Sequence, residues 1–226
     1  MIIAALNEEA AIAKVIAAVP RDLADEIIVV DNGSTDRTAE VASGAGARVV
    51  TQPQRGYGRA FMAGLESISP DCEVVVFLDG DGSDCPEMMD QLVGPIISGT
   101  YDFVIGSRTR GRREPGSMNW HQVVAGYMVG CFLRLLYGVR STDMGPFRAI
   151  RRTTLHSLGM REETYGWPLE MQMRAARAQI RTLEVPVDYR QRAGGRSKIA
   201  GTVRGSIFAA ARILITLIRI ATERRG

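Results

Sequence analysis

The chain reads Val74-Val75-Val76-Phe77-Leu78-Asp79-Gly80-Asp81-Gly82 over residues 74–82. The apolar run predicts a buried strand, and two carboxylates separated by one glycine follow it. Open α/β sheets bind ligands at the carboxyl ends of their strands. Carboxylate oxygens with little bulk between them suit Mg²⁺ or Mn²⁺ bridging a diphosphate, whereas the alternative is a solvated acidic turn. The stretch therefore predicts a metal site held by Asp79 and Asp81.

Two strand–turn–helix units precede this stretch. Residues 1–6 predict a strand and residues 10–19 a helix, and residues 26–31 predict a second strand before a helical pattern at 37–45. Successive units of this kind imply parallel strands joined by right-handed crossovers. Asp31 follows the second strand, where its carboxylate can accept hydrogen bonds from a base or a ribose.

The remaining pattern completes an α/β layout. Strands are predicted near 47–51, 102–106 and 147–150, and a helix begins near 165–170. Gly56-Tyr57-Gly58 reads as a glycine-rich turn into a helix, whose amides can approach a nucleotide closely. Residues 107–121, rich in Arg and Gly, predict a mobile loop beside the site.

In their order along the chain, these motifs resemble glycosyltransferase family 2, and within it the dolichyl-phosphate mannose and glucose synthase-like branch, whose members act on polyprenyl phosphates. The resemblance implies the nucleotide-diphospho-sugar transferase fold of type A, an α/β fold with a central, mostly parallel mixed sheet flanked by helices. The matching segments are residues 4–9, 29–36, 55–60, 77–82, 106–108, 143–148 and 195–198.

The resemblance also implies roles for individual residues. The nucleotide pocket is expected to be lined by Ala5, Asn7, Glu8, Asp31 and Gly58. The donor's diphosphate is expected at Asp79, Asp81 and Ser197. Catalysis is expected to involve Asp81, Glu170, Arg196 and Lys198, with inversion at the anomeric carbon. Glu170 is a candidate base, and its alternative role is to offset the helix dipole.

The loop at residues 194–198 supports this expectation independently, because two cations and a hydroxyl on a glycine-rich loop suit gripping a phosphate. A solvated basic loop is the alternative. The chain departs from the family pattern at Ala4, Asn32, Gly80 and Ser83. These departures leave the reaction class intact and the identity of the sugar open.

The chemistry of the reaction limits the acceptor. A polyprenyl phosphate is already anionic near neutral pH and needs positioning by arginines rather than a strong base. A soluble hydroxylated acceptor would need a base, with Glu170 or Asp143 as first candidates. We therefore expect transfer of a hexose from GDP-mannose or UDP-glucose to a polyprenyl phosphate. Transfer to a soluble acceptor, or a catalytically silent nucleotide-sugar-binding protein, are the alternatives.

Composition agrees with one globular domain. The chain has 226 residues, of which 46% are hydrophobic, enough to bury a sizeable core. Three cysteines and two histidines form neither a disulfide framework nor a zinc motif. We expect a catalytic domain at 1–201, with a nucleotide and metal half at 1–106 and an acceptor half at 107–201, followed by an amphipathic helix at 202–226.

Charge is distributed unevenly. Residues 1–106 contain 6 Lys and Arg against 17 Asp and Glu, whereas residues 107–226 contain 22 against 8. A basic half suits a phosphorylated substrate or an anionic membrane. Nucleic acid is excluded as a partner, because no recognition-helix motif is present and few aromatic residues interleave with the arginines.

Two helical segments raise the question of a membrane. Residues 202–222 place Arg204, Arg212 and Arg219 on one stripe of an otherwise apolar helix. A charge near the centre of this segment argues against a spanning helix and favours an interfacial one, with packing on the core or on a partner subunit as the alternative. Residues 122–137 form either a core helix or a wall facing lipid. The expected location is the cytoplasm, peripherally associated with the cytoplasmic face of the membrane, and a homo-oligomer remains open.

Overall fold

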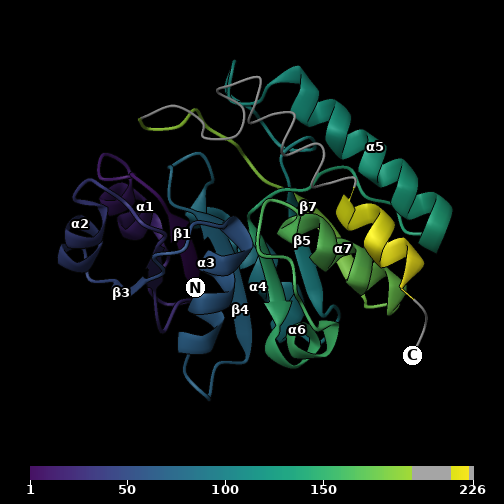
Figure 1. Cartoon of the computed structure of the whole chain (residues 1–226), viewed down its shortest axis with the longest axis horizontal. Helices are drawn as coiled ribbons and strands as arrows, with labels where there is room; N and C mark the ends of the chain where they lie inside the picture. Colours follow the sequence, from purple (N-terminus) through teal and green to yellow (C-terminus); the bar gives the residue numbers. More distant parts are fainter. Residues whose placement is uncertain (195–214, 224–226) are drawn as a thin grey trace.

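The computed structural model describes residues 1–194 and 215–223. Within these residues, seven strands form one sheet in the order β3-β2-β1-β4-β6-β5-β7 (Figure 1). All neighbours are parallel except β6, which runs antiparallel to both β4 and β5. The strands are β1 (Ile2–Ala5), β2 (Ile28–Asp31), β3 (Arg48–Thr51), β4 (Val74–Asp79), β5 (Phe103–Ser107), β6 (Arg148–Arg151) and β7 (Thr182–Pro186).

The predicted strands are confirmed, and the mixed sheet agrees with the expected fold class. The helices are α1 (Ile12–Ala18), α2 (Thr38–Gly44), α3 (Tyr57–Ser67), the 3₁₀ turn η1 (Pro86–Met88), α4 (Met89–Ile97), α5 (Trp120–Tyr137), α6 (Arg152–Leu158) and α7 (Trp167–Arg177). Residues 215–222 form a further helix, called here the C-terminal helix. The sequence did not predict α6 or β7.

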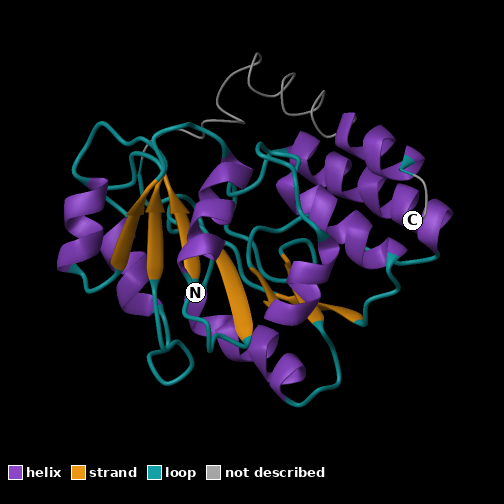
Figure 2. Ribbon diagram, turned by 60° about the horizontal axis from the view of Figure 1, so that its bottom comes forward, coloured by secondary structure: helices purple, strands orange, loops and turns teal. Residues whose placement is uncertain are grey.

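Helices cover both faces of the sheet (Figure 2). On one face, the apolar sides of α1, α2 and α4 pack against the sheet residues Ile3, Val29 and Leu78. On the other face, α3, α6 and α7 pack around Phe77 and Trp167. Strands buried on both faces read as continuous apolar runs, which is why β4 was recognisable in the sequence.

A third apolar cluster joins α5, α7 and the C-terminal helix through Val129, Leu133, Leu169, Met173, Leu217 and Ile220. Figure 1 shows the C-terminal helix, in yellow, beside α5 and α7. One side of α5 is therefore buried. Its opposite side is exposed and apolar, so the core interpretation of residues 122–137 describes one face of this helix, and contact of the other face with lipid remains a prediction.

The expected boundary at residue 106 falls inside β5, and β6 lies between β4 and β5. Both halves of the chain therefore contribute to one sheet. The expected boundary at residue 201 lies outside the described residues. In the described part of the chain, no helix has the length and apolar character needed to cross a membrane.

Candidate active site

Three parallel strands bring the predicted residues to one edge of the sheet. β1 lies between β2 and β4, so that Ala5 pairs with Asp31 on one side and Ala4 with Asp79 on the other. The carboxyl ends of these strands form the floor of a cavity. The strand-end position predicted for the two aspartates is therefore the one the structure has.

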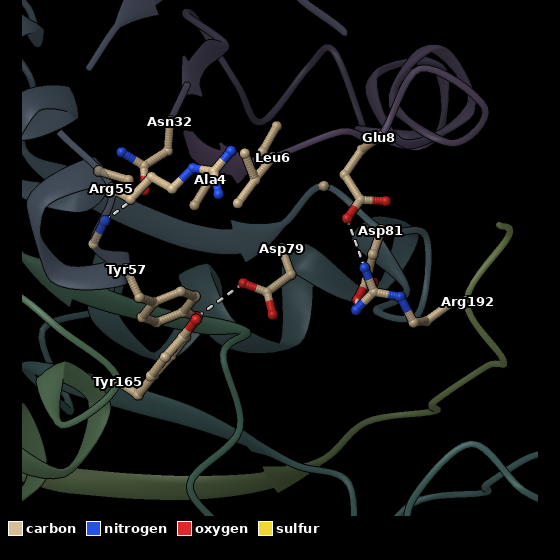
Figure 3. A pocket seen from close by; sticks show the side chains of 14 residues that line it. Ala4, Leu6, Glu8, Asn32, Arg55, Tyr57, Asp79, Asp81, Tyr165 and Arg192 are labelled. Carbon is tan, nitrogen blue, oxygen red and sulfur yellow. Dashed lines mark hydrogen bonds and ion pairs between the residues drawn. The ribbon is translucent and has the colours of Figure 1, made fainter. Parts of the chain in front are cut away.

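The first cavity has a volume of about 330 Å³. Its lining includes both carboxylates of the 79–81 pair, and Figure 3 shows them facing the same space. The polar and aromatic residues of this lining are Glu8, Asn32, Arg55, Tyr57, Asp79, Asp81, Tyr165 and Arg192. A pocket with two aromatic rings, two arginines and a carboxylate pair can hold a nucleoside diphosphate.

Hydrogen bonds hold the carboxylate pair in place. The Tyr57 hydroxyl donates to Asp79 Oδ1 at 2.8 Å. The backbone amide of Ser83 donates to Asp81 Oδ1 at 2.8 Å, and the Ser83 hydroxyl donates to the same oxygen. Arg192 Nη1 lies 2.7 Å from Asp81 Oδ2, the remaining oxygen of that carboxylate. Arg192 also donates to Glu8 Oε1 at 2.6 Å (Figure 3).

The site concentrates negative charge. Burial, together with the charge of Asp81, raises the pKa of Asp79 to about 7. Asp84 is buried close by, and its pKa lies well above its usual value because of burial and the charges of Asp79 and Asp81. One Asp84 oxygen, Oδ1, has no hydrogen-bond partner in the structure. Crowded carboxylates of this kind are typical of functional sites.

The donor set fits a cation shared with a substrate. Among the described residues, no group of three or more His, Cys, Asp or Glu side chains is arranged to hold a metal ion. Asp79 and Asp81 supply hard oxygen ligands, and the pKa of Asp79 is raised by burial and by the Asp81 charge, both of which a bound cation would offset. Mg²⁺ is commonly bound by one or two carboxylates together with substrate phosphates. The residues present therefore fit a divalent ion completed by a diphosphate.

A second cavity, of about 410 Å³, adjoins the first. The two share five lining residues, Tyr57, Asp79, Asp81, Tyr165 and Arg192. The second cavity also reaches Asn119 and Gln122, at the start of α5. The carboxylate pair thus stands where two cavities meet, as required if a group passes from a ligand in one to a ligand in the other.

The wall of the second cavity contains a buried ion pair. Arg108 donates from Nε to Asp143 Oδ2 and from Nη2 to Asp143 Oδ1, both at 2.8 Å. Burial alone would raise the pKa of Asp143, but the Arg108 charge and the hydrogen bonds from Arg108 and Met144 together outweigh it, and the pKa lies below its usual value. The Arg108 guanidinium also lies 4.9 Å from the centre of the Tyr189 ring. Asp143 is therefore a structural carboxylate, and the geometry does not support it as a base.

Glu170 is likewise committed to structure. It lies on α7, is fully buried and lines neither cavity. Its Oε2 accepts from the backbone amides of Arg161 and Glu162 at 2.9 and 2.6 Å. Its Oε1 accepts from Arg174 and Arg219. Both oxygens are taken by these contacts, so the structure shows Glu170 as a buried ion-pair partner, and its role as a catalytic base remains a prediction.

The residues expected in the nucleotide pocket divide into two groups. Ala5 and Glu8 line the first cavity. Asn7, Asp31 and Gly58 line neither cavity. The Asn7 side chain accepts from the Thr35 amide at 2.8 Å, and Asp31 Oδ1 accepts from the Ser34 amide at 3.2 Å. In the structure these two side chains brace loops behind the pocket, and their expected contact with the nucleotide remains a prediction.

The sequence assigned no role to five of the polar and aromatic residues that line the first cavity, namely Asn32, Arg55, Tyr57, Tyr165 and Arg192. Asn32 accepts from the Gly56 amide at 2.8 Å and donates to the carbonyls of Gln52 and Gln54, so it holds the loop that carries Arg55. Tyr165 and Arg192 arrive from distant parts of the chain. The glycine-rich turn marked the position of Tyr57, but no sequence signal distinguished Arg192 from the other arginines. The predicted residues Arg196, Ser197 and Lys198 lie outside the described residues.

Comparison with known proteins identifies the family. The family model described as glycosyl transferase family 2 matches residues 1–159. The chain belongs to glycosyltransferase family 2. An uncharacterised glycosyltransferase of Mycobacterium tuberculosis is 37% identical over 211 residues, which is 92% of this chain and 93% of the relative. A dolichyl-phosphate hexose transferase of Haloferax volcanii is 38% identical over 191 residues, covering 83% of this chain and 81% of the relative.

The solved structure of glucosyl-3-phosphoglycerate synthase from M. tuberculosis, in complex with Mn²⁺, UDP-glucose and phosphoglyceric acid, superposes with a TM-score of 0.76. It is 25% identical in sequence, and the match covers 100% of this chain and 80% of that one. The likeness confirms the type A nucleotide-diphospho-sugar transferase fold. This family 2 protein is therefore a hexosyltransferase, and its resemblance to the polyprenyl-phosphate branch is confirmed.

Proposed function

We propose that this glycosyltransferase moves a hexose from a nucleotide-diphospho-sugar, GDP-mannose or UDP-glucose, to a polyprenyl phosphate, with inversion at the anomeric carbon. The donor occupies the first cavity and the acceptor phosphate enters the second. Asp79 and Asp81, at the junction of the two, hold Mg²⁺ or Mn²⁺ together with the donor's diphosphate.

One observation carries the choice of acceptor. Among the residues that line the second cavity, the only carboxylates are Asp79 and Asp81, which this proposal assigns to the metal ion, and no histidine is present. Burial raises the pKa of Tyr57 well above its usual value, raises that of Tyr165, and raises that of Tyr189 to about 12, so none of these three phenols is suited to accept a proton. A hydroxyl acceptor needs a base, whereas a phosphate is already anionic. The described residues therefore favour a phosphate nucleophile.

The exposed face of α5 supports a lipid-borne acceptor. Seven large apolar side chains of this helix are exposed and form what we call the apolar face: Trp120, Val124, Tyr127, Met128, Phe132, Leu135 and Leu136. Its buried residues, Gly126, Val129, Gly130 and Leu133, occupy the opposite side. Water-facing sides of helices are normally polar, and contiguous apolar surface marks an interaction site. Because α5 begins at the second cavity, a membrane on this face would bring a lipid phosphate to it.

The role proposed for each residue of the site follows from its contacts. A divalent ion, when bound, supplies positive charge against the charge that develops on the leaving diphosphate. Tyr57 and Ser83 orient the two carboxylates through the hydrogen bonds described above. Arg192 lines both cavities and can neutralise phosphate on either side. Arg196, Ser197 and Lys198 are proposed as further phosphate contacts.

A soluble phosphorylated acceptor is the second candidate. It is favoured by the fold likeness to glucosyl-3-phosphoglycerate synthase, whose complex contains UDP-glucose and phosphoglyceric acid. The nucleophile of phosphoglyceric acid would be its hydroxyl, which needs a base, and this candidate also leaves the apolar face of α5 unexplained. Peripheral association with the cytoplasmic face of a membrane belongs to the first candidate.

The experiment offers both acceptors to the purified full chain. GDP-mannose and UDP-glucose, each with Mn²⁺ or Mg²⁺, are supplied together with vesicles containing a polyprenyl phosphate or with phosphoglycerate in solution. We expect a lipid-linked hexose from one donor and no transfer to phosphoglycerate. Transfer to phosphoglycerate alone would establish the second candidate, and failure to bind either donor would contradict the nucleotide-sugar assignment.

A further inference from the structure

Residues 161–166, called here the bridging segment, connect two parts of the molecule that are far apart in sequence. On one side the segment contacts the start of α3, which carries the Gly56-Tyr57 wall of the first cavity. On its other side it contacts the C-terminal helix. The segment itself places Tyr165 in the lining of both cavities.

The contact with α3 is a close backbone approach. A Cβ atom on Gly58 would overlap the carbonyl oxygen of Glu162, so only glycine permits this packing. The Arg59 amide donates to the Glu163 carbonyl at 3.0 Å, and the Arg59 and Glu163 side chains form an ion pair. The Tyr57 and Tyr165 rings lie 6.3 Å apart. A displacement of the bridging segment would therefore move the wall of the donor cavity.

The contact with the C-terminal helix is made by charged and hydroxyl groups. Thr216, fully buried, donates to Glu162 Oε2 at 3.1 Å. Arg219 Nη2 lies 3.2 Å from the same oxygen and 3.1 Å from Glu170 Oε1. A Cβ atom on Gly166 would overlap the Thr216 hydroxyl, so the segment and the helix also pack closely there. Arg219 thus pairs with two buried carboxylates, which agrees with the alternative that this part of the segment packs on the core.

The buried charges explain why this contact holds the segment in position. Glu162 and Glu170 are both almost or completely buried, and Arg174 and Arg219 are the cations that contact them. Glu170 also accepts from the amides of residues 161 and 162, so it clamps the segment's backbone directly. Removing one partner of a buried ion pair leaves an uncompensated charge, which the structure relieves by moving.

We propose that the C-terminal helix is a positioning element of the donor site, acting through Arg219 and Thr216 on Glu162 and from there on Gly58 and Tyr165. The inference rests on the proposed function in that the first cavity holds the nucleotide-sugar. Arg219 is a positioning residue, because it reaches neither cavity. It follows that loss of the Arg219 contact with Glu162 weakens the binding of the donor, while the acceptor cavity's Arg108–Asp143 pair is unaffected.

The first test measures the dissociation constant of the nucleotide-sugar by calorimetry with Mn²⁺ present, using the full chain. Arg219→Met removes the charge, Arg219→Lys keeps it, and Arg177→Met is the matched control. Arg177 holds the same helix through the carbonyls of Ile220 and Glu223 but does not contact the bridging segment. We expect about tenfold weaker donor binding in Arg219→Met, partial recovery in Arg219→Lys, and wild-type affinity in Arg177→Met.

The second test needs no ligand. Hydrogen exchange of the amides of Arg59, Arg161 and Glu162 should accelerate in Arg219→Met, whereas the Gly80 amide, bonded to Ala4 in the sheet, should keep its wild-type rate. Unchanged donor affinity and exchange in Arg219→Met, or equal losses in the Arg177 and Arg219 variants, would overturn the proposal. If the wild-type chain binds no nucleotide-sugar but Arg219→Met alters exchange at Arg59, the proposed function fails and the positioning contact stands.

Discussion

Arg192 forms an ion pair with Asp81, at 2.7 Å from Nη1 to Oδ2, in the space where a divalent ion and a diphosphate would meet. The same guanidinium bonds to Glu8. The Arg192 backbone is held nearby, because the amides of Arg190 and Ala193 donate to the carbonyls of Ser83 and Asp81. A cation fixed in this way both competes with a metal ion for Asp81 and attracts a phosphate.

The first prediction follows from that competition. Arg192→Ala should bind Mn²⁺ alone about fivefold more tightly, because a like charge beside the ion is removed. The same variant should bind a nucleoside diphosphate with Mn²⁺ about tenfold more weakly, because a charge-assisted contact is lost. Both constants are measurable by calorimetry. Arg190→Ala is the control, since Arg190 lies two residues before Arg192 but pairs with the exposed Glu87. Weaker binding of Mn²⁺ alone in Arg192→Ala would refute the competition.

The second prediction concerns the carboxylate pair. Asp81→Ala should reduce transfer by at least about 10²-fold, because one electrostatic stabiliser of the leaving diphosphate is removed. Excess chelator should have the same effect on the wild type. Circular dichroism should show an intact fold. Glu87→Ala, which removes an exposed carboxylate near the same turn, should retain activity. Full activity of Asp81→Ala, or of the wild type in chelator, would remove the metal from the mechanism.

The third prediction is a dependence of stability on pH. Burial and the Asp81 charge raise the pKa of Asp79 to about 7 from the ordinary value of 3.8. Between these pH values the folded protein keeps a proton that the unfolded chain releases, so stability falls as pH rises. The melting temperature of Asp79→Asn minus that of the wild type should therefore increase between about pH 4 and 7 and remain constant at higher pH. Thermal melts in chelator test this, with the exposed Asp71→Asn as control. Parallel pH curves for wild type and Asp79→Asn would contradict it.

The fourth prediction tests the apolar face of α5. Leu135 is 81% exposed on α5, and Ile97 is 69% exposed on α4. Leu135→Glu should reduce flotation with anionic vesicles and transfer to a lipid-borne acceptor, because a charge on the face opposes burial in the lipid interface. Ile97→Glu should do neither. Truncation after Gly201 would be a less specific test of membrane binding, because it would also remove the C-terminal helix that packs against α7. If both variants float to the same extent as the wild type, α5 does not contact the membrane.

The fifth prediction concerns the loop at residues 194–198. Lys198→Ala should lower transfer by about 10²-fold, as expected for losing one cation beside a phosphate. Lys14 is the other lysine in the chain and is exposed, so Lys14→Ala is a matched control. The test compares the initial rates of transfer of the two variants and the wild type at a saturating concentration of donor. If the two variants have the same rate, the loop is a solvated basic segment.

The local sequence pattern was sufficient to predict six strands of the sheet and the position of the Asp79–Asp81 pair. A strand that is buried on both faces has a continuous apolar sequence, which can be recognised directly. The residues that follow this sequence must lie at the carboxyl end of the strand. Asp79 and Asp81 were predictable for this reason. The register that places Asp31 and Asp79 on either side of β1 follows from parallel pairing of neighbouring strands. β7 was not predictable, because its strand character comes from pairing with β5 rather than from its own half-exposed pattern.

Side-chain roles beyond the strand ends depended on packing between distant segments. Glu170 has the residue type of a base, but the rotation of α7 and the arrival of Arg219 turn its carboxylate into a buried ion-pair partner. Arg192 resembles many other arginines in the sequence, yet the fold brings it to Glu8, 184 residues away. The sequence alone therefore determined the family, through the order of its motifs, and six strands of the sheet with the carboxylate pair that follows one of them, because strands and their ends follow from short-range periodicity. The tertiary structure decided which charges face the cavities, because long-range packing sets how each side chain is oriented and which partner it meets.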